Sequence, residues 1–200
     1  MKWLILSLGF SGCLFAVPVD DFIASAKEKH GTEGEKAARF LADHMPTGDK
    51  KKLSAEFLGE NLDLAFKART EFPWAKQVPE GIFLNDVLPY AVFDETREAW
   101  RGSFLEKARP IVKDARTASE AVQALNREFF NLVKVHYNTG RKRPNQSPSE
   151  SMELGKATCT GLSIILVDAC RAVGIPARAV GTPMGADERG NHTCVQIWDR

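Results

Sequence analysis

Two residues in the last quarter of the 200-residue chain have the types that nucleophilic catalysis needs. Cys159 begins an apolar segment with helical spacing, and the free amides and the dipole at a helix start stabilise a thiolate. The same amides can stabilise the oxyanion that forms when a thiolate attacks a carbonyl group. His192 lies 33 residues later (192 − 159), at the start of a β-like segment, where it could act as the general base of Cys159. Each residue also has an ordinary interpretation, as a small buried cysteine and as a surface histidine.

The segments around these two residues predict one helix and two strands. Apolar residues at helical spacing predict a helix over 158–173, and Gly174 follows it where a left-handed residue often ends a helix. Gly161, in its first turn, is expected to leave room for a substrate. The segments 175–180 and 193–198 are β-like, and a turn is predicted between them at 183–190. This turn and the loop at 138–150, rich in Gly, Pro, Ser and Asn, are expected to flank a substrate cleft.

The chain before this region predicts one helix after another, from residue 20 to about residue 140. Helical spacing of apolar residues covers the segments 35–44, 54–72, 82–88 and 94–107. A capping box at Thr117 and Glu120 predicts a helix that runs to about Tyr137. Its inward residues are expected to be Val122, Leu125, Phe129, Leu132 and Val133, with His136 also in the core. The lysines at 50–52 are expected in a solvated turn.

The sequence GKATCTGLSIILVDACRAVGIPARAV at 155–180, followed by GNHTCVQIWD at 190–199, resembles the transglutaminase-like superfamily. The resemblance covers residues 155–200 and rests on a Cys that opens an apolar helix, a Gly-Ile-Pro-Ala-Arg exit and a His on the next strand. It implies a core helix packed on an antiparallel sheet, and a Cys-His-Asp triad in which Cys159 is the nucleophile and His192 the general base.

The chain departs from the family pattern at two positions. Cys194 stands where the family often has an aromatic residue, and no strand that could supply the triad carboxylate follows. Asp199 fits that role poorly, because it points away from the face of His192 and lies about 23 Å further along the strand.

These observations together predict an α+β protein with three parts. Residues 1–16 are a signal peptide, 17–140 a helical region and 141–200 a transglutaminase-like core. The missing carboxylate suggests that the sheet of this core is incomplete and that the chain is a fragment of a longer protein.

The first sixteen residues have the pattern of an export signal. Lys2 precedes an apolar run, and Ala16 supplies a cleavage site, which predicts a secreted or periplasmic protein without a membrane span. A cut before Cys13 would instead leave a lipid-anchored protein. Cleavage after Ala16 leaves Cys159, Cys170 and Cys194, an odd number, so at least one thiol would stay unpaired in an oxidising compartment.

We therefore expect an exported cysteine enzyme that acts on the amide bonds of a protein or peptide substrate through a thioester. The alternative is an inactive transglutaminase-like binding module of the cell envelope. A metal site formed by Cys159, His192 and Cys194 ranks below both, because the spacing lacks the close pairs of structural zinc sites. No cofactor or metal is expected, and 27 basic against 26 acidic residues give no reason to expect nucleic acid binding. The sequence leaves open the substrate, hydrolysis against transfer, and the oligomeric state.

Overall fold

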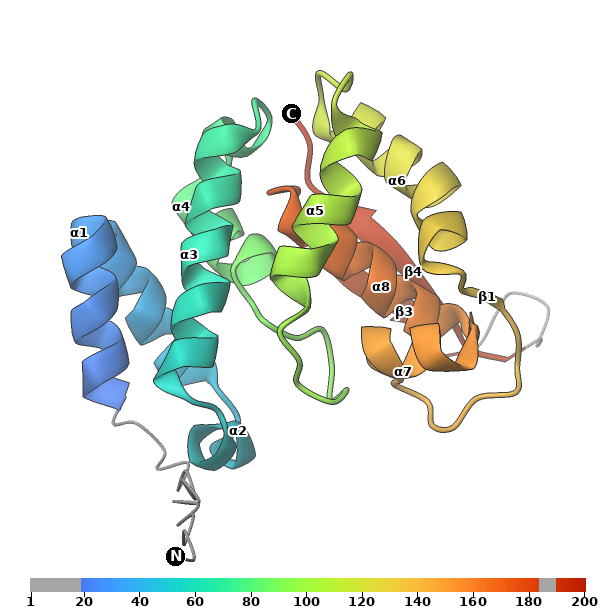
Figure 1. Cartoon of the computed structure of the whole chain (residues 1–200), viewed down its shortest axis with the longest axis horizontal. Coiled ribbons are helices and arrows are strands. Elements are labelled where there is room, and N and C mark those ends of the chain that lie inside the picture. Colours follow the sequence, from blue (N-terminus) through green and yellow to red (C-terminus); the bar gives the residue numbers. More distant parts are fainter. Residues whose placement is uncertain (1–18, 184–189) are drawn as a thin grey trace, which may run out of the picture.

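The computed structural model of the chain describes residues 19–183 and 190–200 (Figure 1). The signal peptide predicted at 1–16 lies outside the described residues, and so does most of the turn predicted at 183–190. In the described part of the chain, no helix is both long enough and apolar enough to cross a membrane.

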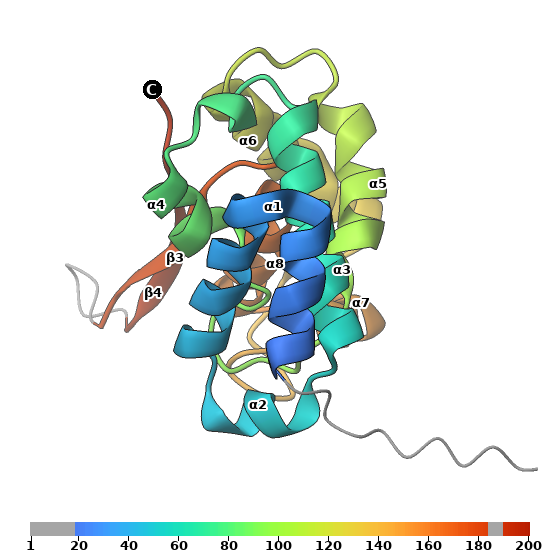
Figure 2. The same ribbon diagram turned by 90° about the vertical axis from the view of Figure 1, so that its left-hand side faces the viewer.

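In the described part of the N-terminal half, every regular element is a helix. Its elements are α1 (Val19–His44), α2 (Thr47–Lys52), α3 (Ala55–Glu71), the 3-10 helix η1 (Ala75–Gln77), α4 (Glu80–Ile82) and the π-helix η2 (Phe83–Val87). Gly31 has φ 64° and ψ −149°, and α1 folds back there, so that its two arms lie side by side (Figure 2). A Cβ at Gly34 would lie 2.2 Å from the carbonyl oxygen of Ala26, so glycine is what allows the two arms to touch.

The C-terminal half is organised around one buried helix. Its elements are α5 (Trp100–Val112), α6 (Ala118–Val133), β1 (His136–Tyr137), α7 (Pro148–Leu154), β2 (Lys156–Ala157), α8 (Cys159–Ala172), β3 (Ala177–Thr182) and β4 (His192–Ile197). Helices α5 and α6 and the β3–β4 hairpin pack against α8 (Figure 1). Strands β3 and β4 are antiparallel, with Ala177 opposite Ile197 and Thr182 opposite His192, whereas β1 and β2 are parallel. A helix-rich chain with small sheets agrees with the expected α+β class.

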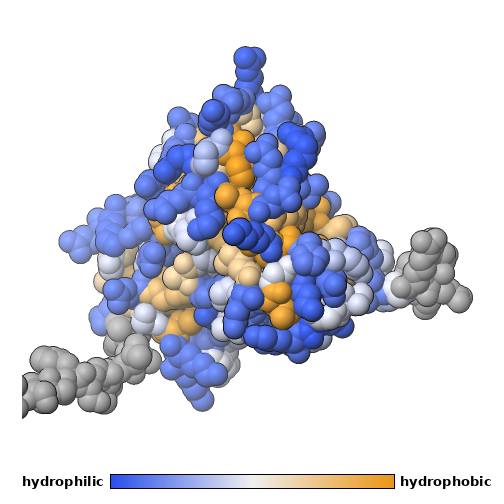
Figure 3. All heavy atoms as spheres, turned by 45° about the vertical axis from the view of Figure 1, so that its right-hand side comes forward, coloured by the Kyte–Doolittle hydropathy of each residue, from blue (hydrophilic) through white to orange (hydrophobic). Residues whose placement is uncertain are grey.

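Two apolar clusters fill the interior. One lies among α1, α3 and the segment 78–90, and the other surrounds α8. On the surface, apolar residues form only small patches between hydrophilic side chains in the view of Figure 3. The structure is therefore one packed body in which α8 provides the centre of the larger cluster.

Local sequence signals account for some of the helix boundaries. The hydroxyl of Ser54 accepts a hydrogen bond from the N–H of Phe57 and starts α3. The capping box expected at Thr117 and Glu120 is half formed: Thr117 accepts the N–H of Glu120 and starts α6, but the Glu120 carboxylate accepts the N–H of Arg116. The helix at 82–88 is confirmed as α4 followed by η2. Gly174 has φ 73° directly after α8, as its position predicted.

Other expectations differ from the structure. The lysines at 50–52 are exposed to solvent as expected, but they form the last turn of α2 rather than a turn between helices. The helix expected over 94–107 begins only at Trp100, because the buried carboxylate of Glu95 accepts the N–H groups of Val92 and Phe93 and holds a turn there.

The end of α6 also differs from the expectation. The helix stops at Val133, since Lys134 takes the left-handed conformation and the N–H of Val135 returns to the carbonyl of Phe130. His136 is therefore exposed on β1 rather than in the core, and the Leu132 side chain is 50% exposed.

A buried carboxylate on α8 has no partner. Asp168 is fully buried, and neither of its oxygens has a hydrogen-bond partner among the described residues. Burial raises the pKa of this carboxyl well above its ordinary value, although the charges of Arg171 and Arg101 oppose the shift.

Substituting Asp168→Asn tests this burial through the pH dependence of stability. The carboxyl of an unfolded chain titrates near pH 4. The folded carboxyl holds its proton to higher pH than the unfolded one. The contribution of Asp168 to the free energy of unfolding is therefore complete below about pH 4 and is lost as pH rises towards the folded pKa. The Asn variant cannot lose a proton, so its free energy of unfolding relative to the parent should rise between pH 4 and pH 8 in urea titrations. A difference that stays constant over this range would contradict the expectation.

Gly174→Ala should destabilise the fold, because a Cβ there would lie 2.6 Å from the Cβ of Ala75 on a left-handed backbone. The free energy of unfolding should fall by about 2–4 kcal/mol. Gly59→Ala is the matched control: it lies inside α3 with nothing within 4 Å of its Cβ, and it should gain about 0.5–1 kcal/mol. Equal losses in both variants, measured by chemical denaturation, would refute the steric argument.

Candidate active site

Cys159 is the first residue of α8, and it is half-buried. Thr158 precedes it as the N-cap with extended backbone, but the Thr158 side chain makes no capping hydrogen bond. The first N–H groups of a helix have no partner inside the helix, so the start of α8 offers donors close to the sulfur. These are the features expected where a thiolate or an oxyanion is to be stabilised.

Gly161 has a packing role that the sequence analysis did not foresee. A Cβ at Gly161 would lie 2.8 Å from the Cβ of Ala157 and 3.5 Å from the hydroxyl of Ser151. Gly161 therefore lets β2 and α7 pack closely against the first turn of α8, rather than opening space for a substrate.

The loop before α7 is fixed to the start of α8 by Gln146, which is only 1% exposed. The side-chain oxygen of Gln146 accepts the N–H of Lys142 at 3.0 Å, and its amide nitrogen donates to the carbonyl of Lys156 at 3.2 Å. The loop so held places Arg141 beside the N-cap, where its guanidinium donates to the hydroxyl of Thr158 at 3.4 Å. No sequence signal points to Gln146. For the basic run at 141–143, the sequence favours a solvated loop tip over contact with an acidic partner, in a loop expected to flank a substrate cleft.

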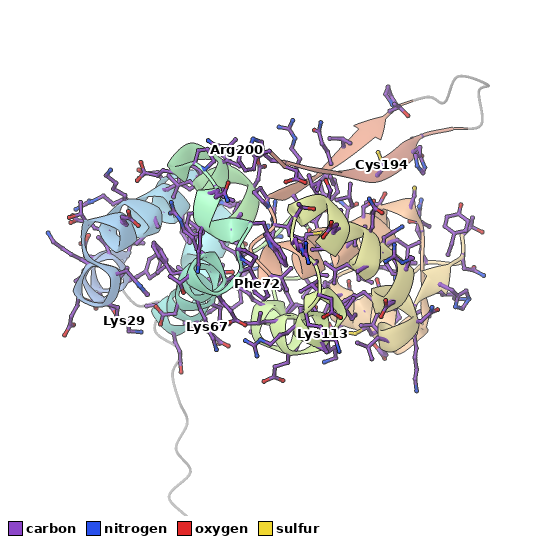
Figure 4. The ribbon with its side chains drawn as sticks, turned by 90° about the horizontal axis from the view of Figure 1, so that it is seen from above. Lys29, Lys67, Phe72, Lys113, Cys194 and Arg200 are labelled. Carbon is purple, nitrogen blue, oxygen red and sulfur yellow. The ribbon has the colours of Figure 1, made fainter. Side chains whose placement is uncertain are left out.

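His192 is the first residue of β4, on the exposed face of the hairpin. Along β4 the side chains alternate: His192, Cys194 and Gln196 are exposed, and the residues between them are half-buried. Figure 4 shows Cys194 on the hairpin at the edge of the molecule. The next residue, Thr193, faces α8, and its hydroxyl lies 3.2 Å from the hydroxyl of Thr160.

The structure thus brings the two segments together but does not bond the two predicted residues. Thr160 follows Cys159, and Thr193 follows His192, so the contact between the threonines makes the start of α8 and the start of β4 neighbours. Among the hydrogen bonds of the described residues, none joins Cys159 to His192. The catalytic roles of both residues remain predictions.

Asp199 has a different environment from that of a triad carboxylate. Its carboxylate accepts the backbone N–H of Ser119 at 2.9 Å, in the first turn of α6. A carboxylate at this position stabilises a helix N-terminus, so Asp199 ties the end of the hairpin to α6.

In the part of the chain that the structure describes, Cys170 and Cys194 form no disulfide or metal-binding group with Cys159. Within residues 19–183 and 190–200, no three His, Cys, Asp or Glu side chains are grouped so that they could hold a metal ion. The proposed cluster of Cys159, His192 and Cys194 therefore has no support. Cys159, Cys170 and Cys194 are all free thiols, and burial raises the pKa of Cys170.

Comparison with known protein families identifies the class of the C-terminal half. Residues 106–200 match the family model of the transglutaminase-like superfamily. The expected resemblance is thereby confirmed, and the match extends it from residue 155 back to residue 106, inside α5. The chain thus contains a transglutaminase-like segment that includes α6, α7, α8 and the β3–β4 hairpin. No curated protein and no solved structure was found to match the chain.

The three thiols should differ sharply in their reaction with iodoacetamide. In the native protein, exposed Cys194 and half-buried Cys159 should both be alkylated, whereas buried Cys170 should react only after denaturation. Mass spectrometry of proteolytic peptides measures each site separately. Alkylation of Cys170 at the rate of Cys194 under native conditions would contradict the buried placement.

Proposed function

We propose that this protein is a cysteine enzyme that acts on amide bonds through a thioester at Cys159. The observation that carries the proposal is the position of Cys159, half-exposed at the start of α8 inside a segment that matches the transglutaminase-like superfamily. The pattern of residues 1–16 supports export, and the proposed substrate is a protein or peptide.

The reaction proposed for Cys159 has two steps. The thiolate attacks the carbonyl carbon of the amide, and a carbon–sulfur bond forms as the amide nitrogen takes a proton and leaves as an amine. Water, or a second amine, then attacks the thioester, and the thiol is released as an acid or a new amide forms. The N–H groups at the start of α8 are the donors proposed to stabilise the oxyanion in both steps.

His192 is the proposed general base, and this role requires its imidazole to come within hydrogen-bond distance of Cys159. The contact between Thr160 and Thr193 supports the proposal, since it holds the start of β4 against the first turn of α8. The side chain of His192 belongs to the exposed face of β4 and forms no hydrogen bond with Cys159 among the described residues, so the proposal requires the imidazole to approach Cys159 when substrate binds. Catalytic hydrogen bonds often tighten only when substrate is bound.

The same observation favours a second candidate function, a binding module without catalysis. An outward His192, together with Cys194 at the position where the family often has an aromatic residue, fits a scaffold that has lost its catalytic pairing. Such a module would bind peptides beside α8 and would not turn them over.

The substitution Cys159→Ala separates the two functions. Turnover of glutamine-containing peptides, measured as ammonia release, peptide cleavage and dansylcadaverine incorporation, should fall by at least about 100-fold. His192→Ala should also lower turnover strongly, while Cys194→Ser, a matched thiol control, should retain it. Circular dichroism would verify that each variant is folded.

Turnover by Cys159→Ala at the parent rate would refute the proposed nucleophile. Peptide binding by the parent protein without any turnover would instead favour the binding module.

A further inference from the structure

Positive charge gathers beside Cys159. The segment 134–143 contains Lys134, Arg141, Lys142 and Arg143 and no acidic residue. The pairing of β1 with β2 sets His136 next to Lys156, which brings a further cation to the same place.

Two of these cations form ion pairs within the described part of the chain, and two others have no such partner there. Lys142 forms an ion pair with Glu153 at 3.4 Å, and Arg143 forms one with Glu150 at 3.1 Å. Among the described residues, neither Arg141 nor Lys156 has an ion-pair partner within 4.0 Å. The start of α8 is therefore bordered by positive charge that the described part of the chain does not neutralise.

Among the described cations of this group, Arg141 is the one whose side chain forms a hydrogen bond with the residue before Cys159. One of its terminal nitrogens donates to the hydroxyl of Thr158, the residue before Cys159. The side chain of Gln146 accepts the N–H of Lys142, and the side chain of Asn138 accepts the N–H of Gly140. The backbone is therefore held by a hydrogen bond on each side of Arg141. A guanidinium has five N–H donors, and Thr158 uses one, which leaves a fork of donors for a carboxylate.

The neighbouring strand offers an edge suited to an extended peptide. The N–H groups of His136 and Asn138 donate to the carbonyls of Gly155 and Ala157 on β2. The N–H of Tyr137, between them, therefore points to the other side of β1, as alternation along a strand requires. The ring of Tyr137 is 62% exposed, opposite Ala157 in the register, two residues before Cys159. Peptides often bind by adding a strand to such an edge.

We propose that Arg141 is a substrate-recognition residue that selects acidic peptides, by binding an Asp or Glu carboxylate one residue before the carbonyl presented to Cys159. The inference rests on the proposed function in one respect: it takes Cys159 as the nucleophile that attacks this carbonyl group. The charge of the surface indicates which peptide binds. The cations beside the start of α8 favour an acidic peptide segment over a neutral or basic one.

The first test compares two alkylating reagents that differ in charge. In a Cys194→Ser background, the rate at Cys159 is measured by mass spectrometry with iodoacetate and with iodoacetamide. Both reagents attack the same thiolate, so the ratio of the two rates cancels any change in thiolate reactivity and reports the local charge. Arg141→Gln should lower the iodoacetate-to-iodoacetamide ratio about threefold at low salt, and the effect should shrink in 0.5 M NaCl.

The matched control is Arg143→Gln, which removes the same charge from the same loop but from an arginine already paired with Glu150. It should leave the ratio nearly unchanged. Equal slowing of both reagents by Arg141→Gln would overturn the proposal, because Arg141 would then only brace Thr158. An equal fall of the ratio in both variants would also overturn it, since the charge effect would not be specific to Arg141.

The second test identifies the acidic peptide as the ligand. Two peptidyl chloromethyl ketones, acetyl-Glu-Ala and acetyl-Gln-Ala, differ only by a carboxylate against an amide. The parent and Arg143→Gln should label faster at Cys159 with the Glu reagent, and Arg141→Gln should lose this preference. No preference in the parent would overturn the assignment of an acidic peptide even if iodoacetate were favoured. Neither test requires turnover, so the two proposals can fail separately. A protein that shows no turnover but still reacts faster with the Glu reagent would refute the proposed enzymatic function and support the role of Arg141 in recognition.

Discussion

Two buried arginines connect the two apolar clusters, and the position of α8 depends on them. Arg101, on α5, donates to the side chain of Asn61 on α3, to the carbonyl of Arg171 on α8 and to carbonyls of the segment 87–89. Arg171 donates to carbonyls of residues 86, 89, 91 and 177. Burying a guanidinium is costly unless its donors are satisfied, so the irregular segment between η2 and α5 is held where its carbonyls meet these charges. The helical N-terminal half thereby braces the last turn of α8, whereas Cys159 in the first turn stays half-exposed.

This arrangement explains which parts of the fold the sequence could predict. Helix α8 has apolar residues on all sides, so its limits follow from composition and from Gly174. The C-terminal end of α6 and the start of α5 could not be predicted in the same way. The first depends on the left-handed backbone of Lys134, and the second on the turn that the Glu95 carboxylate holds. A helical pattern records which residues favour a helix, but tertiary contacts decide where the helix stops.

The candidate site also has residues whose position the sequence could predict and residues whose position it could not. The place of Cys159 at the start of α8 was predictable, since it depends on local sequence alone. The direction of His192 was not, because the face of a strand residue is set by strand register and by which side packs on α8. Gln146 and Arg141 act through contacts across a loop that has no periodic pattern, and only the structure shows that this loop is joined to the start of α8.

The hairpin that carries His192 is held very differently at its two ends. At the base, Ala177 is buried, Ile197 packs against the larger cluster, and the N–H of Trp198 donates to the carbonyl of Pro176. Towards the other end, the hydroxyls of Thr160 and Thr193 form a hydrogen bond between α8 and β4, and His192 and Thr182 are exposed. A single hydrogen bond between two half-buried hydroxyls contributes only about 1 kcal/mol of net stability, so rotating this end costs less than moving the base. A hairpin fixed at one end and lightly held at the other can therefore present His192 outward, as observed, and still turn it towards Cys159 without disturbing the core.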